Sequence, residues 1–180
     1  MDTDFRPLPS EQWPDALEHL KGSFAEQLNV YRVMAHNPAL LSAWAGFRKH
    51  VVVENCLGAD LTEIAILRAA YHLKSQYERA HHIVRARACG VSDKVIRDIL
   101  DGRLVDDERY SVIVQSVDEL VRDARLQPTT VSTLVAAVGK PGVLDLIAIV
   151  GFYTTLGCIL NSFETPVENH ISAELDTSPL

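Results

Sequence analysis

The amino-acid sequence predicts an all-α protein that forms a single-domain helical bundle. Three observations support this fold class. Apolar residues recur at spacings of three and four along most of the 180 residues, residues that favour helix N-caps precede these runs, and no segment alternates apolar and polar residues as a half-buried strand would. The length is typical of one domain and is enough to bury a sizeable core.

Two helices are expected in the first third of the chain. Residues 10–21 start with Ser10 as a cap and keep Pro14 in the first turn, where proline is tolerated. Residues 38–52 follow Asn37 as the cap and carry an amphipathic stripe, which consists of Leu41, Trp44, Ala45 and Arg48.

The centre of the chain predicts three more helices. Residues 61–73 are apolar on nearly every side, which indicates a helix that is buried all round. Residues 76–89 mix apolar with basic and polar side chains and end before Gly90, a natural C-cap. Ser92 then caps a helix over residues 93–101.

Three helices are expected in the last part of the chain. Residues 107–125 predict a helix because spacings of three and four dominate, and Pro128 opens a short helix that ends at Val138. Residues 143–163 contain Asp145 as their only charged residue and approach the length of a bilayer span. Glycine, threonine and asparagine interrupt this apolar run and few basic residues flank it, so we expect a buried helix rather than a membrane anchor.

Self-association is expected from the apolar helix over residues 143–163. A helix that is apolar on all sides must be buried on every side, and one small domain has few residues to pack around it. We therefore expect that other copies of the chain bury the rest, in a homo-oligomer. The C-terminal residues 164–180 are polar and acidic with two prolines. The sequence is consistent with two states of this tail, disorder or contact with a neighbouring subunit.

Charge and cysteine content narrow the function classes. A formal net charge of −7 argues against a nucleic-acid partner, since proteins that bind phosphate backbones concentrate Lys and Arg. The stretch from Met1 to Pro9 is acidic and proline-bearing, so we expect no signal peptide. The three cysteines have no pairing pattern, which is typical of a reducing, cytoplasmic compartment.

Glu63, Ser75, Glu78 and His82 form the candidate active centre. Glu78 and His82 are four positions apart, so they share one face of a helix. A carboxylate beside an imidazole can move protons at neutral pH, because it tunes a group that already titrates near neutrality. The alternative is helix capping, since Ser75 with Glu78, and Asp60 with Glu63, have the spacing of capping boxes. Both roles stay open from spacing alone.

Three stretches carry a family likeness: residues 61–70 (LTEIAILRAA), 77–82 (YERAHH) and 88–92 (ACGVS). They resemble the carboxymuconolactone decarboxylase family, whose superfamily includes the alkylhydroperoxidase D-like proteins. Further similar segments are residues 7–9 with 13–14, 36–40 with 44, and 150–153 with 161. The likeness covers residues 1–163, which we take as the helical domain, and leaves the tail outside. It implies an alkylhydroperoxidase D-like bundle that assembles into trimers or hexamers.

One departure from the peroxidase branch of this superfamily is informative. In that branch the positions matching Ser75 and Glu78 are a pair of cysteines, flanked by a Glu that matches Glu63 and a His that matches His82. This sequence lacks both cysteines at these positions, and its own cysteines are widely separated, at Cys56, Cys89 and Cys158. A dithiol cycle at this centre is therefore not expected. The resemblance favours the decarboxylase branch, in which acid–base groups work without a redox cofactor.

The resemblance and the spacing together assign expected roles. His82 is the expected proton donor, with Glu78 and Glu63 orienting it and raising its pKa. Arg85, on the same helix face, is expected to hold a substrate carboxylate, with an ion pair to Glu78 or a solvated face as the alternative. Ordinary structural roles remain the alternative for the other candidate substrate-binding residues, which are His81, Tyr71, His50, Tyr153 and Asn161.

We expect a cofactor-free decarboxylase, or a related proton-transfer lyase or isomerase, that acts on a small conjugated carboxylated lactone or keto acid. No cofactor is expected because such a substrate supplies its own electron sink, and no metal is expected because the His and Glu spacing matches no recognised metal signature. The expected partners are an organic-acid substrate and further copies of the chain. A thiol-dependent peroxidase-like defence protein and a non-catalytic, small-molecule-binding helical oligomer stay open as alternatives.

Overall fold

The computed structural model describes residues 3–180, and within them the chain is helical and contains no strand. Met1 and Asp2, which begin the segment expected to contain no signal peptide, lie outside the described residues. The all-α fold class is confirmed. The elements are η1 (Ser10–Gln12), η2 (Asp15–Leu20), α1 (Phe24–Gln27), α2 (Asn29–Met34), α3 (Pro38–Arg48), η3 (Lys49–Glu54), α4 (Ala59–Leu73), α5 (Gln76–Ala88), α6 (Asp93–Leu100), α7 (Glu108–Asp123), α8 (Pro128–Ser162) and α9 (Asn169–Thr177).

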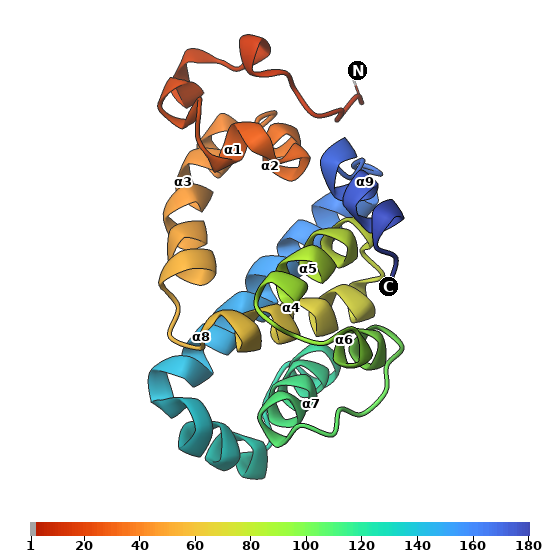
Figure 1. Cartoon of the computed structure of the whole chain (residues 1–180). Helices are drawn as coiled ribbons and strands as arrows, with labels where there is room; N and C mark the ends of the chain where they lie inside the picture. The colour runs from red at the N-terminus through yellow and green to blue at the C-terminus, as the bar shows by residue number, and fades with distance from the viewer. Residues whose placement is uncertain (1–2) are drawn as a thin grey trace.

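Helix α4 lies at the centre of the bundle. It packs against α5, α6, α7 and α8, as Figure 1 shows. Every residue from Leu61 to Ala70 is buried, which confirms the prediction of a helix covered on all sides for these residues. The last three residues of the predicted span, 71–73, are exposed or partly exposed. The helix ends at Lys74, which adopts a left-handed conformation with φ of 54°, and Ser75 then caps α5. This tight turn places α4 and α5 side by side.

The N-terminal segment differs from the expected helix over residues 10–21. It forms the two short 3₁₀ turns η1 and η2, separated by extended residues at Trp13 (ψ 136°) and Pro14 (ψ 153°). A residue before proline is pushed out of the helical region by contact with the proline ring, so Trp13 breaks the helix. The prediction of one α-helix here was wrong, although Trp13, Leu17 and Leu20 are all buried as their spacing suggested.

Helix α3 begins as predicted but changes form near its end. The Asn37 side chain accepts a hydrogen bond from Leu40 N at 3.1 Å and caps the helix. After Arg48 the chain continues as the π-helical segment η3 instead of a regular helix to residue 52. The wider turn of a π-helix changes the direction of the side chains that follow it, and such turns are frequent at functional sites.

Helix α8 contains both helices expected after Pro128. Gly139 has non-helical angles (φ 70°, ψ 171°) and divides α8 into two arms, which correspond to the predicted segments 128–138 and 143–163. By length and composition alone α8 could cross a membrane, since its most apolar window has a mean hydropathy of 2.1. Within the structure 56% of that window is buried, as in the core helix of a soluble protein.

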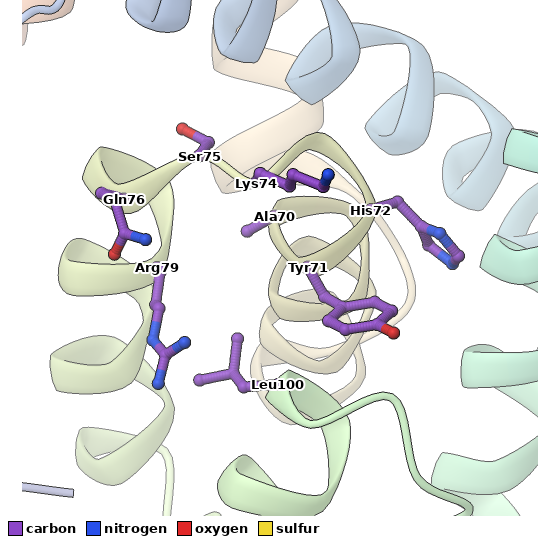
Figure 2. A pocket seen from close by; sticks show the side chains of 8 residues that line it. All are labelled: Ala70, Tyr71, His72, Lys74, Ser75, Gln76, Arg79 and Leu100. Carbon is purple, nitrogen blue, oxygen red and sulfur yellow. The ribbon is translucent and has the colours of Figure 1, made fainter.

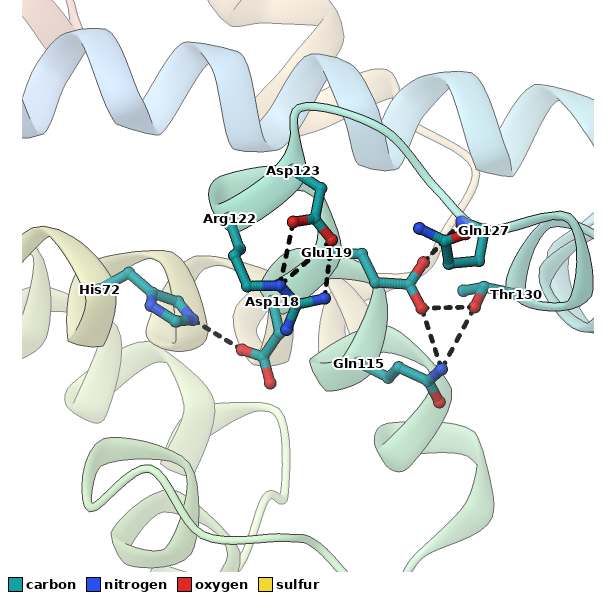
Figure 3. A network of polar contacts seen from close by, with 8 residues as sticks. All are labelled: His72, Gln115, Asp118, Glu119, Arg122, Asp123, Gln127 and Thr130. Atoms are coloured by element: carbon teal, nitrogen blue, oxygen red, sulfur yellow. Dashed lines mark hydrogen bonds and ion pairs between the residues drawn. The ribbon is translucent and has the colours of Figure 1, made fainter.

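A network of polar side chains joins α7 to its neighbours, as Figure 3 shows. Asp118 accepts hydrogen bonds from His72 of α4 at 2.6 Å and, in bidentate geometry, from Arg68 at 2.6 and 2.8 Å. The Glu119 carboxylate accepts from Gln127 N at 2.8 Å and from Thr130 Oγ1 at 2.7 Å. These bonds satisfy carboxylates that the packing of α7 partly buries.

The C-terminal residues 164–180 pack against helices of the same chain. They contain α9, which packs against α5 and buries Ile171. Arg87 of α5 donates a hydrogen bond to Ser178 O at 2.7 Å. Glu168, the residue before α9, is buried, and its carboxylate contacts the α5 surface. The segment therefore reaches the helix that carries the candidate active centre.

Candidate active site

His82 lies between two carboxylates. Its Nδ1 is 2.5 Å from Glu63 Oε2, and its Nε2 is 3.2 Å from Glu78 Oε2. Glu63 comes from α4, whereas Glu78 and His82 lie on one face of α5. All three residues are buried, with exposed fractions of 8% for Glu63, 3% for Glu78 and 2% for His82. The packing of α4 against α5 thus assembles the predicted trio.

Neither glutamate closes a capping box. Ser75 caps α5, since its hydroxyl accepts a hydrogen bond from Glu78 N at 3.4 Å, but its own backbone N–H donates to Ala70 O at 3.1 Å. At the start of α4 the N-cap is Gly58, which has no side chain to form a box with Glu63. Both carboxylates are therefore available to the imidazole.

The protonation state of His82 depends on two opposing effects. Burial lowers the pKa of His82, but the charges of Glu63 and Glu78 and the hydrogen bonds to them outweigh burial and raise the pKa above its ordinary value of 6.5. A ring nitrogen that meets an ionised carboxylate donates its proton, so both nitrogens carry protons when both carboxylates are ionised. The arrangement holds His82 as an imidazolium, which is a proton donor.

A small cavity borders His82. Its volume is about 20 Å³, which is enough for about one water molecule. From α5 it is lined by His81, Arg85 and Glu78 in addition to His82, and from α8 by Tyr153. Arg85 is half-buried, and within residues 3–180 no ion pair joins it to Glu78. Arg85 therefore brings a positive charge to the cavity wall.

Tyr153 contributes a hydroxyl group to this site. Its ring meets the His82 imidazole edge-on, with centroids 5.1 Å apart and an interplanar angle of 88°. Burial and the nearby carboxylate of Glu78 raise the pKa of Tyr153 well above its ordinary value, so the phenol keeps its proton. Tyr153 is 4% exposed, and its hydroxyl makes no hydrogen bond within the described part of the chain. Because Tyr153 lines the cavity, its hydroxyl is available as a donor to a bound molecule.

Sequence reasoning missed Tyr31 and Arg48, which line the same cavity. Burial raises the pKa of Tyr31 to about 12, and the positive charge of Arg48 opposes this effect in part. The Arg48 guanidinium also lies 3.8 Å from the centroid of the Phe24 ring. The available signal was the position of Arg48 at the end of an otherwise apolar stripe. Tyr31 had no comparable signal, because it lies far from the quartet in sequence.

Tyr71 lies away from His82. It borders a separate surface pocket of about 350 Å³ together with Lys74, Gln76 and Arg79, as Figure 2 shows. The Tyr71 hydroxyl lies above Gly102, where an added Cβ would come within 2.3 Å of it. The structure therefore does not bring Tyr71 into the His82 cavity.

His50 and Asn161 also lie outside the cavity. His50 Nε2 is 2.7 Å from Asp145 Oδ1, and the other Asp145 oxygen accepts hydrogen bonds from Cys56 N at 2.8 Å and Cys56 Sγ at 3.0 Å. Asn161 Nδ2 donates to Leu73 O at 2.8 Å. These contacts join α8 to η3 and to the end of α4.

The His82 cavity has no thiol in its lining. The three cysteines are exposed, and none of them lines the His82 cavity. Among residues 3–180 no group of three or more His, Cys, Asp or Glu side chains is arranged to hold a metal ion. The chemistry that the described side chains offer here is proton transfer and binding of an anion.

The arrangement of helices defines an alkylhydroperoxidase D-like fold, as the resemblance implied. The debrominase Bmp8, solved as a Cys-to-Ala variant with 2,3,4-tribromopyrrole, has 18% sequence identity and a TM-score of 0.77, with 98% of each chain covered. An uncharacterized peroxidase-related protein from Silicibacter sp. TM1040 has 16% identity and a TM-score of 0.72, covering 95% of this chain and 92% of that one. No family model and no curated protein sequence matches this chain.

Proposed function

We propose that the protein is a cofactor-free proton-transfer enzyme, a decarboxylase or a related lyase or isomerase, that acts on a small conjugated organic acid. The observation that carries this proposal is the buried imidazole of His82, held between Glu63 and Glu78 at the edge of a cavity. Two carboxylates orient the ring and keep a proton on it, which suits general acid catalysis. The reaction class comes from the resemblance to the carboxymuconolactone decarboxylase family.

The decarboxylation proceeds through an enolate. The bond between the substrate carboxylate and its carbon breaks, carbon dioxide leaves, and the electron pair is delocalised into the conjugated carbonyl. The Tyr153 hydroxyl donates a hydrogen bond to the oxygen on which negative charge develops. Nε2 of His82, whose contact with Glu78 is the longer of its two carboxylate contacts, delivers a proton to the carbon that lost the carboxylate, and His82 is then reprotonated by solvent.

Positive charge is needed to bind an anionic substrate here. With both carboxylates ionised and His82 protonated, the trio carries a net negative charge that repels an acid. Arg85 and Arg48 line the cavity from α5 and α3 and offset this repulsion, so they are the groups that hold the substrate carboxylate. The cavity of about 20 Å³ is far smaller than a typical ligand site, so its wall opens when substrate enters. The α2 residues Val30 and Tyr31 belong to that wall.

The structural neighbours support a catalytic role. Bmp8 is named a debrominase, and one of its structures contains a small conjugated ring compound. A second neighbour is named peroxidase-related. A thiol-dependent peroxidase is the weaker candidate for this chain, since no cysteine lines the His82 cavity. The experiment below distinguishes an enzyme from a non-catalytic helical oligomer, because only an enzyme would show turnover that depends on His82.

The test is turnover of carboxymuconolactone by the purified protein without added metal or reductant. Loss of lactone absorbance and release of carbon dioxide are measured for the parent, for His82→Gln and for His19→Gln, which changes an exposed histidine. We expect turnover by the parent and by His19→Gln, and a loss of roughly 100-fold or more in His82→Gln with helicity retained. A parent protein that releases no carbon dioxide removes the decarboxylase proposal, and an active His82→Gln removes His82 as the acid.

A further inference from the structure

We propose that His81 is a general base of the same cavity and that Glu168, from the C-terminal segment, is its positioning residue. The inference rests on the proposed function and adds a second activity to it, the removal of a proton from carbon next to a carbonyl group. Decarboxylation needs only an acid, because the electron pair is supplied by the bond that breaks. A base beside that acid gives the site the two groups that a proton shift requires.

The contacts of Glu168 hold His81 in one orientation. One Glu168 oxygen is hydrogen-bonded to His81 Nε2, and the other accepts from Tyr77 OH and from Asn29 N, each at 2.6 Å. The Tyr77 ring also stacks on the imidazole, with centroids 4.5 Å apart and planes 29° apart. His81 is 4% exposed and Glu168 is 9% exposed, so both groups are shielded from solvent.

The hydrogen bonds of this pair leave one ring nitrogen of His81 without a protein partner among the described residues. Burial raises the pKa of Glu168, but hydrogen bonds from His81, Tyr77 and Asn29 outweigh burial and lower the pKa. The ionised carboxylate only accepts hydrogen bonds, so Nε2 of His81 is the donor in its hydrogen bond with Glu168. Nδ1 makes no hydrogen bond within residues 3–180, and His81 lines the cavity. His82 differs, because both of its nitrogens meet carboxylates.

The second activity is enolisation of a carbonyl acid. Nδ1 of His81 takes a proton from the carbon next to the carbonyl group, the C–H electron pair forms the carbon–carbon double bond, and the carbonyl π pair moves to oxygen. Tyr153 donates a hydrogen bond to that oxygen, as in the decarboxylation. Glu168 stabilises the imidazolium that forms on His81. Return of a proton to the same carbon completes an exchange, and its return to the far carbon of a conjugated enolate completes an isomerisation, with no other reactant.

The test is hydrogen–deuterium exchange of levulinate, a small keto acid, in deuterated buffer, followed by proton NMR. We expect the parent to exchange the protons next to the ketone, His81→Gln to lose the catalysed exchange, and Glu168→Gln to slow it by roughly tenfold or more. Glu168→Asp is expected to recover part of the rate.

Three outcomes overturn the inference. These are a parent that does not exchange levulinate, a folded His81→Gln that exchanges as fast as the parent, and a folded Glu168→Gln that exchanges as fast as the parent. Helicity and the unfolding midpoint are measured for each variant, so that a loss of exchange caused by unfolding is recognised. Nitrogen NMR of the parent adds a measurement that does not depend on turnover, and we expect it to show Nδ1 of His81 unprotonated. Release of carbon dioxide from carboxymuconolactone is measured separately, so failure of the proposed decarboxylase is distinguishable from failure of the base.

Discussion

His82 Nδ1 lies 2.5 Å from Glu63 Oε2, although the two residues belong to different helices. The partner on its own helix, Glu78, is more distant from the ring, at 3.2 Å from Nε2. The shorter contact is therefore the one that depends on the packing of α4 against α5. Because the shorter hydrogen bond crosses between helices, a change at Glu63 tests both the orientation and the charge of the imidazole.

Glu63→Gln is expected to move the pH dependence of turnover. His82 acts as an acid, so the rate falls as pH rises through its pKa, and Glu63 raises that pKa above 6.5. Removing the charge lowers the pKa, so the fall in rate occurs at lower pH than in the parent. The measurement is the pH profile of kcat, with the exposed Glu11→Gln as the control. A fall at the same pH in parent and Glu63→Gln would contradict the assignment.

Glu168→Gln is expected to lower the free energy of unfolding at neutral pH by about 1–3 kcal/mol, since it weakens buried hydrogen bonds to a charged group. The folded-state pKa of Glu168 is lowered from 4.5, so its contribution is present above pH 4.5 and is lost as pH falls through the folded-state pKa. Urea unfolding of parent and variant checks this between pH 3 and 7. A difference in unfolding free energy between parent and variant that grows toward low pH would contradict this prediction.

Asp145→Asn is expected to make the Cys56 thiol more reactive. The hydrogen bond from Cys56 Sγ to Asp145, followed by burial and the carboxylate charge, raises the pKa of Cys56. A neutral side chain lowers that pKa and increases the thiolate fraction, so the reaction with a disulfide reagent at pH 8 accelerates severalfold. The rate is measured in a background in which Cys89 and Cys158 are changed to Ser. An unchanged or slower rate would reject the role of Asp145.

Gly142→Ala is expected to destabilise the fold by about 1–3 kcal/mol. A Cβ at this position would lie 2.6 Å from Val138 Cβ, an atom that cannot rotate away. Gly151→Ala on the same helix is the matched control, because no atom lies within 4 Å of its added Cβ. In a helix interior that change is expected to stabilise by about 0.5–1 kcal/mol. Equal unfolding midpoints for the two variants would contradict the packing argument.

We propose that the outer face of α8 forms a contact between copies of the chain. Leu144 on this face is 68% exposed and Ile147 is 41% exposed, while α3 adds Phe47, which is 43% exposed and packs on Phe152 of α8. Leu144→Glu is expected to lower the oligomeric state measured by light scattering, because it buries a charge in an apolar contact. Ala136→Glu, at an exposed position of the first arm of α8, serves as the control. A parent that is monomeric at micromolar concentration would reject the proposal.

Local residue patterns predicted most of the helices and part of the candidate site. The spacing of four between Glu78 and His82 is a property of one helix, so it could be interpreted without knowing how helices pack. The break between Trp13 and Pro14 was also a local signal, which the predicted helix over residues 10–21 overlooked. Glu168 could not be found in this way, since nothing in a polar tail indicates which helix it contacts.

The sequence by itself determined which helices form, that α4 is buried on all sides, and that Glu78 and His82 share one face. The family resemblance already placed Glu63 beside His82, and the structure shows this contact. Only the tertiary structure decided that Tyr31 and Arg48 border the same cavity and that Tyr71, His50 and Asn161 do not. The reason is physical: apolar periodicity states which face of a helix is buried, but the neighbour that covers this face depends on the angles and distances at which all the helices pack together.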